Sequence, residues 1–231
     1  PARSPAARPL EAGPMTTTTS VPTVNSDEVR VDDECMIDSF FIQTSKGVWR
    51  GRSVRVLKGR ASVTAYVDKL LRTAPRHRNL LPLVATCEQP SMVLLDGGGT
   101  PLYDLLNGGG GVADVAAVAR DVAAGMRVLH AANLYLGGVW SRGIYIDEHG
   151  GAKLGCFEEL EVVGSDMRLT LTRLMVPDDI RRMIYVFNNF LDGPPSNQPL
   201  AGDIYSFGVL LWEMYNGGNL PKPGSFQDVL K

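Results

Sequence analysis

The chain is 231 residues long, and 44% of its residues are hydrophobic while 21% are charged. That is enough apolar material for a sizeable core, in one large domain or two small lobes. The formal net charge of −2 argues against a general nucleic-acid-binding protein, which would carry a strong basic excess. No apolar run approaches the roughly 18 residues that a membrane span needs, so no membrane anchor is predicted in this chain.

The cysteines are few and irregularly spaced: Cys35, Cys87 and Cys156 are odd in number and form no Cys-x-x-Cys pair. Neither a disulfide framework nor a zinc site is therefore predicted, and a reducing compartment fits best. We expect a cytoplasmic protein, or the cytoplasmic part of a membrane protein.

Residues 1–34 are predicted to be a disordered tail. They contain repeated prolines and a Thr16–Thr19 run, and they lack aromatic residues. Such a composition cannot bury enough apolar surface to offset the entropy lost on ordering. Folded structure is expected to start at Cys35.

Residues 35–96 show the pattern of short strands around one helix. An apolar stripe predicts that helix over residues 61–73. The expected strands, which are short and rich in apolar and β-branched residues, lie at Phe40–Ile42, Gly47–Trp49, Val54–Leu57, Leu80–Val84 and Met92–Leu95. The following Gly97–Gly99 is typical of a linker.

Residues 97–231 are richer in helical patterns. Helices are predicted at Leu102–Leu106, Val112–Ala132 and Asp203–Tyr215, the last capped by Asp203. Nearly every face of this last helix is apolar, which predicts a buried central position. A strand-rich half, a glycine hinge and a helix-rich half together indicate a bilobal α+β architecture.

Four segments in this order resemble motifs of the protein kinases, in particular the tyrosine-kinase-like branch. They are RHRNLLPLVATC (76–87), DVAAGMRVL (121–129), GDIYSFGVLLWEM (202–214) and GGNLPKPG (217–224). The resemblance covers residues 38–231. It implies a small β-rich N-lobe over 35–96 and a partial helical C-lobe over 97–231 that lacks the family's last helices.

The resemblance also implies that the catalytic residues are absent. The position of the family's base, an Asp, is held by Gly138, and the two magnesium-ligand positions are held by Gly143 and Cys156. A neutral thiol is a poor ligand for Mg²⁺, which prefers oxygen. Arg142 and Phe157 keep the family residues. No catalytic residue and no metal site are expected, and Gly143→Asn is expected to be tolerated by the fold.

The nucleotide-binding positions also depart from the family pattern. The glycine-rich loop falls on residues 43–49, where only Gly47 is present, and Leu57 holds the lysine position. The neighbouring Lys58 and its partner position Asp68 are weak candidates for cofactor binding, and both also fit exposed, solvated charges. Lys58 reaches the nucleotide side only if a bulge shifts the strand. No cofactor is expected, and binding of ATP without magnesium is left open.

Two further positions bear on structure. Asn189 replaces a family Glu. Asp203 is retained, and the resemblance implies that its carboxylate braces the backbone of Leu136–Val139.

The favoured hypothesis is a pseudokinase that acts in signalling by protein binding or allosteric switching. Its expected partners are other signalling proteins, such as an active kinase or a receptor, and not nucleic acid. They would dock on the helix at 61–73 or on residues 159–185. A residual tyrosine or serine/threonine protein kinase that binds ATP through displaced residues is one alternative. A truncated fragment without independent function is the other, since the partial lobe would expose apolar surface at Phe207–Met214.

Overall fold

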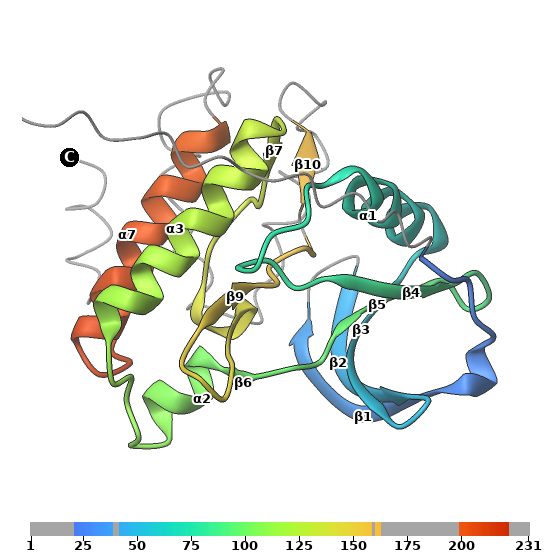
Figure 1. Ribbon diagram of the computed structural model, residues 1–231, viewed down its shortest axis with the longest axis horizontal. Helices are drawn as coiled ribbons and strands as arrows, with labels where there is room; N and C mark the ends of the chain where they lie inside the picture. Colours follow the sequence, from blue (N-terminus) through green and yellow to red (C-terminus); the bar gives the residue numbers. More distant parts are fainter. Residues whose placement is uncertain (1–20, 39–41, 159, 163–198, 222–231) are drawn as a thin grey trace, which may run out of the picture.

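The computed structural model describes residues 21–38, 42–158, 160–162 and 199–221. These residues form a mixed α+β structure with an antiparallel sheet and four α-helices. In Figure 1 the sheet and helix α1 (Ala61–Thr73) lie at one end of the molecule, and helices α3 (Val115–Ala131) and α7 (Pro199–Tyr215) lie side by side at the other. None of the described helices is both long and apolar enough to cross a lipid bilayer.

The sheet has five strands in the order β1-β2-β3-β5-β4, and neighbouring strands are antiparallel. The strands are β1 (Val29–Asp38), β2 (Ile42–Trp49), β3 (Arg52–Gly59), β4 (Leu83–Cys87) and β5 (Met92–Asp96). Strand β3 is central, and its residues 54–57 are buried on both faces. Val54 and Val56 face one apolar cluster, and Leu57 faces the other, because successive side chains of a strand point to opposite faces.

The prediction that folded structure starts at Cys35 is wrong. A short 3₁₀ turn (Ser26–Glu28) leads into β1, and Val24 donates a backbone hydrogen bond to the Thr86 carbonyl at 2.8 Å. Residues 22–24 thereby cover the free edge of β4. Backbone hydrogen bonds at the sheet edges hold this segment, and they need no apolar side chains. Its composition therefore resembled that of a disordered tail. Residues 1–20 lie outside the described part.

Helix α1 has the predicted bounds, and its buried face includes Val67, Leu70 and Leu71. Strand β5 also lies where it was predicted. Strand β4, however, begins at Leu83 and not at Leu80. Pro82 precedes it and has no N–H to donate to a ladder. Leu81 instead donates its N–H to the Leu154 carbonyl at 2.8 Å, which joins the segment before β4 to the helix-rich half.

The helix-rich half contains short strands between its helices. The remaining elements are β6 (Thr100–Pro101), α2 (Leu102–Asn107), β7 (Leu134–Tyr135), a 3₁₀ turn (Ser141–Gly143), β8 (Ile144–Ile146), β9 (Ala152–Leu154) and β10 (Glu161–Val162). They pair as β6-β8-β9 and β10-β7. Helix α3 begins after Asp114, whose carboxylate accepts a hydrogen bond from the Ala117 N–H at 2.8 Å.

Helix α7 differs from the prediction in two ways. It begins at Pro199, so Asp203 lies inside the helix and does not cap it. Its burial is also one-sided: Leu210 and Met214 are buried, whereas Trp212 is 51% exposed. In the described part of the chain its main helical neighbour is α3, which covers a single face. An apolar pattern on all faces therefore overstated the burial of this helix.

Candidate functional site

The two positions that the resemblance assigns to metal ligands, Gly143 and Cys156, meet at the β8–β9 hairpin. The hairpin pairs Ile144 with Leu154, and Gly155 donates its N–H to the Gly143 carbonyl at 2.8 Å. This register places Cys156 beside Gly143, at the open end of the hairpin. Both residues are buried. The structure thus brings together the two predicted metal-ligand positions.

The space beside Gly143 is fully occupied. A Cβ atom built on Gly143 would overlap the Cys156 sulfur and would also lie 3.2 Å from the Cys156 Cα. The structure argues against the expectation that Gly143→Asn is tolerated, and the obstacle is close packing and not backbone conformation. Among the described residues, no three His, Cys, Asp or Glu side chains gather where they could hold a metal ion.

The third predicted position, Gly138, lies in the loop between β7 and the Ser141–Gly143 turn. Its neighbour Gly137 has a φ of 72°, whereas Gly138 has no positive φ. The left-handed conformation that favours glycine is thus needed at Gly137. Side chains of α7 hold this loop in place.

Helix α7 braces this loop through buried hydrogen bonds. The Asp203 carboxylate accepts one from the Leu136 N–H at 2.9 Å, and His130 Nε2 lies 2.8 Å from the same oxygen. The Ser206 hydroxyl accepts a further hydrogen bond from the Val139 N–H at 2.8 Å. The predicted bracing role of Asp203 is confirmed.

An arginine that sequence reasoning did not select occupies the centre of the site. Arg55 lies two residues before Leu57 on β3, so both side chains point to the same face of the sheet. Arg55 is only 4% exposed. Its Nη2 donates a hydrogen bond to the Gly99 carbonyl at 3.1 Å, and its Nη1 lies 2.9 Å from the Met36 sulfur. The guanidinium therefore spans from the sheet to the start of the helix-rich half.

The face of the Arg55 guanidinium is covered by Tyr145 of β8. The guanidinium carbon lies 4.8 Å from the centroid of the Tyr145 ring, within the range of a cation–π interaction. Burial raises the pKa of the Tyr145 hydroxyl far above its ordinary value, and the Glu158 carboxylate raises it further while Arg55 opposes the change. Tyr145 is consequently a neutral partner of the buried cation.

Two more polar contacts cross between the sheet and the helix-rich half. The buried Glu158 carboxylate accepts a hydrogen bond from the Thr44 hydroxyl of β2 at 2.7 Å. Arg142 donates to the Met36 carbonyl of β1 at 3.2 Å, and its guanidinium carbon lies 4.2 Å from the Tyr103 ring centroid. With Arg55, these contacts tie three strands of the sheet to the opposite half.

The predicted nucleotide candidates do not join this site. Strand β3 pairs with β2 and β5 in regular register, so no bulge turns Lys58 inward, and its side chain is exposed. Within the described residues the ion pair of Asp68 is with Arg72, at 2.9 Å, and not with Lys58. The interpretation of Lys58 as a solvated charge fits the structure.

Residues 43–49, where the resemblance places the family's glycine-rich loop, form no loop. These residues form the body of β2, and a Cβ built on Gly47 would lie 2.7 Å from the Arg30 carbonyl oxygen. This glycine permits close approach of β1 and does not form a loop. The connection between β1 and β2, like Asn189 and most of the predicted docking segment 159–185, lies outside the described residues.

One sequence signal could have found Arg55. Arg55 is the one charged residue in the apolar strand Val54–Leu57. It is two residues before the apolar Leu57, so the two side chains point to the same face of the strand. A charge at an inward-facing position of a central strand requires a buried partner. The partner Tyr145 could not be found in this way, since a tyrosine in an apolar strand is ordinary.

No protein-family model matches the chain.

Proposed function

We propose that the chain is a catalytically inactive protein-kinase-like domain that acts in signalling by binding other proteins. The observation that carries this proposal is the buried stack of Arg55 on Tyr145. It lies in the space where the resemblance would place a nucleotide.

Strand geometry explains why this is the relevant space. In the resemblance, Leu57 holds the position of the phosphate-binding lysine, and Gly143 and Cys156 hold those of the metal ligands. A nucleotide would have to lie between these positions. Arg55 shares the face of Leu57, and Tyr145 lies on the strand that follows Gly143. The four side chains Arg55, Leu57, Tyr145 and Cys156 are all buried, so protein atoms fill the space.

The order of elements supports the finer, bilobal form of the proposal. A five-stranded antiparallel sheet carries one helix, α1, between β3 and β4. Among the described residues, three further helices and the short β8–β9 hairpin follow. This is the arrangement that the resemblance implies for a small N-lobe followed by a helical C-lobe. The bracing of the 136–139 backbone by α7 fits a loop that kept its scaffold after losing its chemistry.

Entry of a nucleotide would require displacement of Arg55. The displaced side chain would leave the Gly99 carbonyl without this hydrogen bond and would expose Tyr145 to the ligand. When a protein rarely populates the conformation that can bind a ligand, the apparent affinity for that ligand falls in proportion to the population of that conformation. We therefore expect weak nucleotide binding or none. This expectation separates the proposal from the alternative of an active kinase with displaced residues.

A thermal-shift titration with ATP, with and without Mg²⁺, tests the proposal. Ligand at about 100 times its dissociation constant stabilises a protein by about 2.7 kcal/mol, so binding would be visible. We expect no Mg²⁺-dependent shift and no transfer of radiolabelled phosphate to the chain or to generic peptides. Mg²⁺-specific stabilisation together with phosphate transfer would establish the active-kinase alternative. The same titration on Arg55→Ala reports whether Arg55 excludes the nucleotide.

A further inference from the structure

One side chain of β1, Met36, contacts the buried Arg55 through its sulfur. The ladder between β1 and β2 shifts its register between Cys35 and Ile37, so Met36 lies in a bulge and has no paired residue in β2. Its sulfur lies 2.9 Å from the Arg55 Nη1, and its carbonyl oxygen accepts a hydrogen bond from Arg142 at 3.2 Å. Met36 thus contacts one arginine of the sheet and one of the helix-rich half.

The Arg55 guanidinium has few strong hydrogen-bond acceptors around it. Among the described residues, its oxygen partner is the Gly99 carbonyl, at 3.1 Å, and its Nε has no hydrogen-bond partner. The Met36 sulfur stands where another acceptor is needed, but a thioether accepts hydrogen bonds only weakly. A buried charge without good partners is costly. One oxygen atom added to this sulfur would supply a strong acceptor for the cation.

Met36 is also accessible to an oxidant dissolved in water. It is partly exposed, whereas the other methionines in the described part of the chain, Met92, Met126 and Met214, are at most 4% exposed. A small oxidant therefore meets the Met36 sulfur far more often than the buried ones. The side chain has three rotatable bonds, so its sulfur can shift to make room for an added oxygen.

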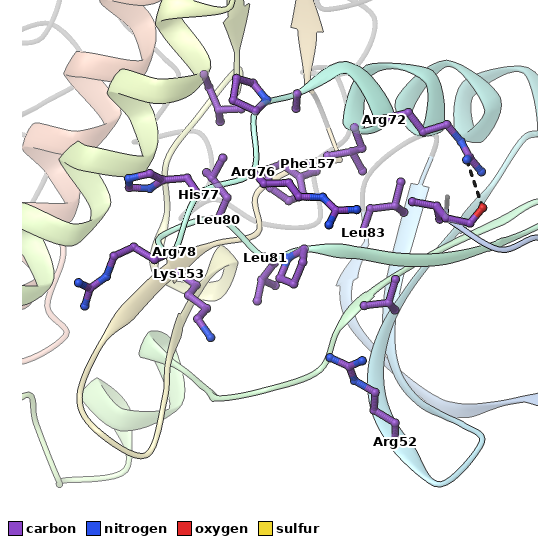
Figure 2. Close-up of a pocket in the computed structure, with 17 residues that line it drawn as sticks. Arg52, Arg72, Arg76, His77, Arg78, Leu80, Leu81, Leu83, Lys153 and Phe157 are labelled. Atoms are coloured by element: carbon purple, nitrogen blue, oxygen red, sulfur yellow. Dashed lines mark hydrogen bonds between the residues drawn. The ribbon is translucent and has the colours of Figure 1, made fainter. Parts of the chain in front are cut away.

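The cavity at the loop between α1 and β4 lies apart from this contact. It has a volume of about 440 Å³, and Arg52, Arg72 and Arg76 are among the residues that line it (Figure 2). Arg52 and Arg72 already form ion pairs with carboxylates. Neither residue of the sulfur–guanidinium contact lines this cavity, so the two arginine-containing regions are separate.

We infer that Met36 is a site of reversible oxidation by hydroperoxides, and that its sulfoxide oxygen accepts a hydrogen bond from Arg55. The sulfur attacks the OH oxygen of the hydroperoxide. An S–O bond forms as the O–O bond breaks, and the proton of the transferred OH group passes to the leaving oxygen, which departs as water or an alcohol. The sulfur loses two electrons and the peroxide gains them. Two thiols restore the thioether and yield one disulfide and one water, as in methionine sulfoxide reductases.

Oxidation at this position stabilises the protein. A sulfoxide in an apolar core disrupts packing, because it makes the side chain polar. The oxygen on Met36 instead faces a buried cation and gains a charge-assisted hydrogen bond. Arg55 also donates to the Gly99 carbonyl, so the new bond links β1 through Arg55 to the start of the helix-rich half. The inference goes beyond the proposed function and does not depend on it.

Two substitutions at Met36 test the hydrogen bond without an oxidant. Met36→Gln places a carbonyl oxygen near the position of the sulfoxide oxygen, and Met36→Leu provides no acceptor. We expect Met36→Gln to melt about 3 °C above Met36→Leu, the effect of one hydrogen bond to a charged group in a chain of this size. With Arg55→Met added to both, the order should reverse, because the glutamine then has no cation to contact.

Hydrogen peroxide tests the modification on the full chain. Cys35→Ser is the starting protein, because the thiol next to Met36 also reacts with peroxide. Peptide mapping by tandem mass spectrometry should find one added oxygen on Met36 before the three buried methionines are oxidised. The oxidised protein should melt about 3 °C higher, by the same single hydrogen bond. Methionine sulfoxide reductase with a thiol should reverse both changes.

Met36→Leu in the same background, oxidised in the same way, is the control. It reports the effect of every other methionine, including those outside the described residues, and its melting temperature should not rise. Three results would overturn the inference. They are a Met36 that stays reduced while the buried methionines are oxidised, an oxidised protein that melts no higher than the reduced one, and an equal rise in Met36→Leu or Arg55→Met.

Discussion

Arginine has opposite surroundings in the two regions described above. Arg55 is buried between the sheet and β8, where a carbonyl oxygen, a sulfur and an aromatic ring surround its guanidinium. Arg76 is exposed at the rim of a cavity whose lining has no acidic residue among those described. Burying a cation costs several kcal/mol unless its partners are well placed, whereas an exposed cation is solvated at little cost. The first arginine is thus held inside the protein by its surroundings, whereas the second is solvated at the surface.

The largest expected difference in stability is between the alanine variants of these two arginines. Arg55→Ala should lower the free energy of unfolding by about 3 kcal/mol, because it leaves a cavity beside Tyr145. Arg76→Ala should change it by less than about 0.5 kcal/mol. Chemical denaturation of both variants measures the difference. Similar losses at the two positions would contradict the contrast.

A conservative variant sharpens the same comparison. Arg55→Met retains most of the side-chain volume and removes the buried charge. It also removes the Nε atom of Arg55, which has no hydrogen-bond partner in the structure. Replacing buried charged groups by apolar ones of similar volume is often nearly neutral. We therefore expect Arg55→Met to cost less than about 1.5 kcal/mol. A loss as large as that of Arg55→Ala would mean that the charge, and not the volume, stabilises the site.

Close packing in the filled site predicts an intermediate effect. Gly143→Ala should destabilise the protein by roughly 2 kcal/mol, because its Cβ would overlap the Cys156 sulfur. Cys156→Ala removes that sulfur, so the double variant should recover part of the loss, with a coupling of about 1 kcal/mol. Gly208→Ala is the control, since a Cβ on this helical glycine meets no atom within 4 Å. Additive effects at Gly143 and Cys156 would contradict the predicted overlap.

The brace from α7 is expected to contribute somewhat less. Asp203→Ala would leave the buried Leu136 N–H without its acceptor and should cost about 1.5 kcal/mol. Asp203→Asn keeps one acceptor oxygen, and its amide would replace the Oδ1 atom that has no hydrogen-bond partner. We expect the Asn variant to be the more stable of the two in urea denaturation. The opposite order would show that the negative charge itself holds the loop.

The smallest effect concerns an exposed ion pair at the sheet edge. The backbone N–H of Asn25 and the Arg50 side chain lower the pKa of Glu28 below its ordinary value of 4.5. A lowered pKa means that the folded state prefers the ionised form, so the stabilisation is present above pH 4.5 and is lost as the pH falls through the lower folded pKa.

Thermal melting across this pH range measures the contribution of Glu28. The melting temperature of Glu28→Gln should lie slightly below that of the wild type at neutral pH, and the gap should close in acid. Glu34→Gln, at an exposed carboxylate of the edge strand β1 that follows Glu28, serves as the control. A gap that stayed constant with pH would exclude the charge of Glu28 as its cause.

Several parts of the fold could be predicted from sequence because their signals are local. The apolar stripe of α1 and the strand at β5 depend on periodicity within one segment, and both lie where they were expected. The start of the fold could not be found in this way. Residues 22–24 are held by hydrogen bonds to Thr86 of β4, and residues 29–31 pair with β2; composition carries no information about such partners. The start of β4 was missed although Pro82 marks it.

For the candidate site, the sequence by itself determined which chemical groups are present: glycines at positions 138 and 143, a thiol at Cys156, and a charge at Arg55 within an apolar strand. Only the tertiary structure decided what these groups do. The register of the β8–β9 hairpin packs Cys156 on Gly143, and the approach of β3 to β8 places Arg55 on Tyr145. Such contacts join residues distant in sequence, and their geometry depends on how whole elements pack, which no local pattern encodes.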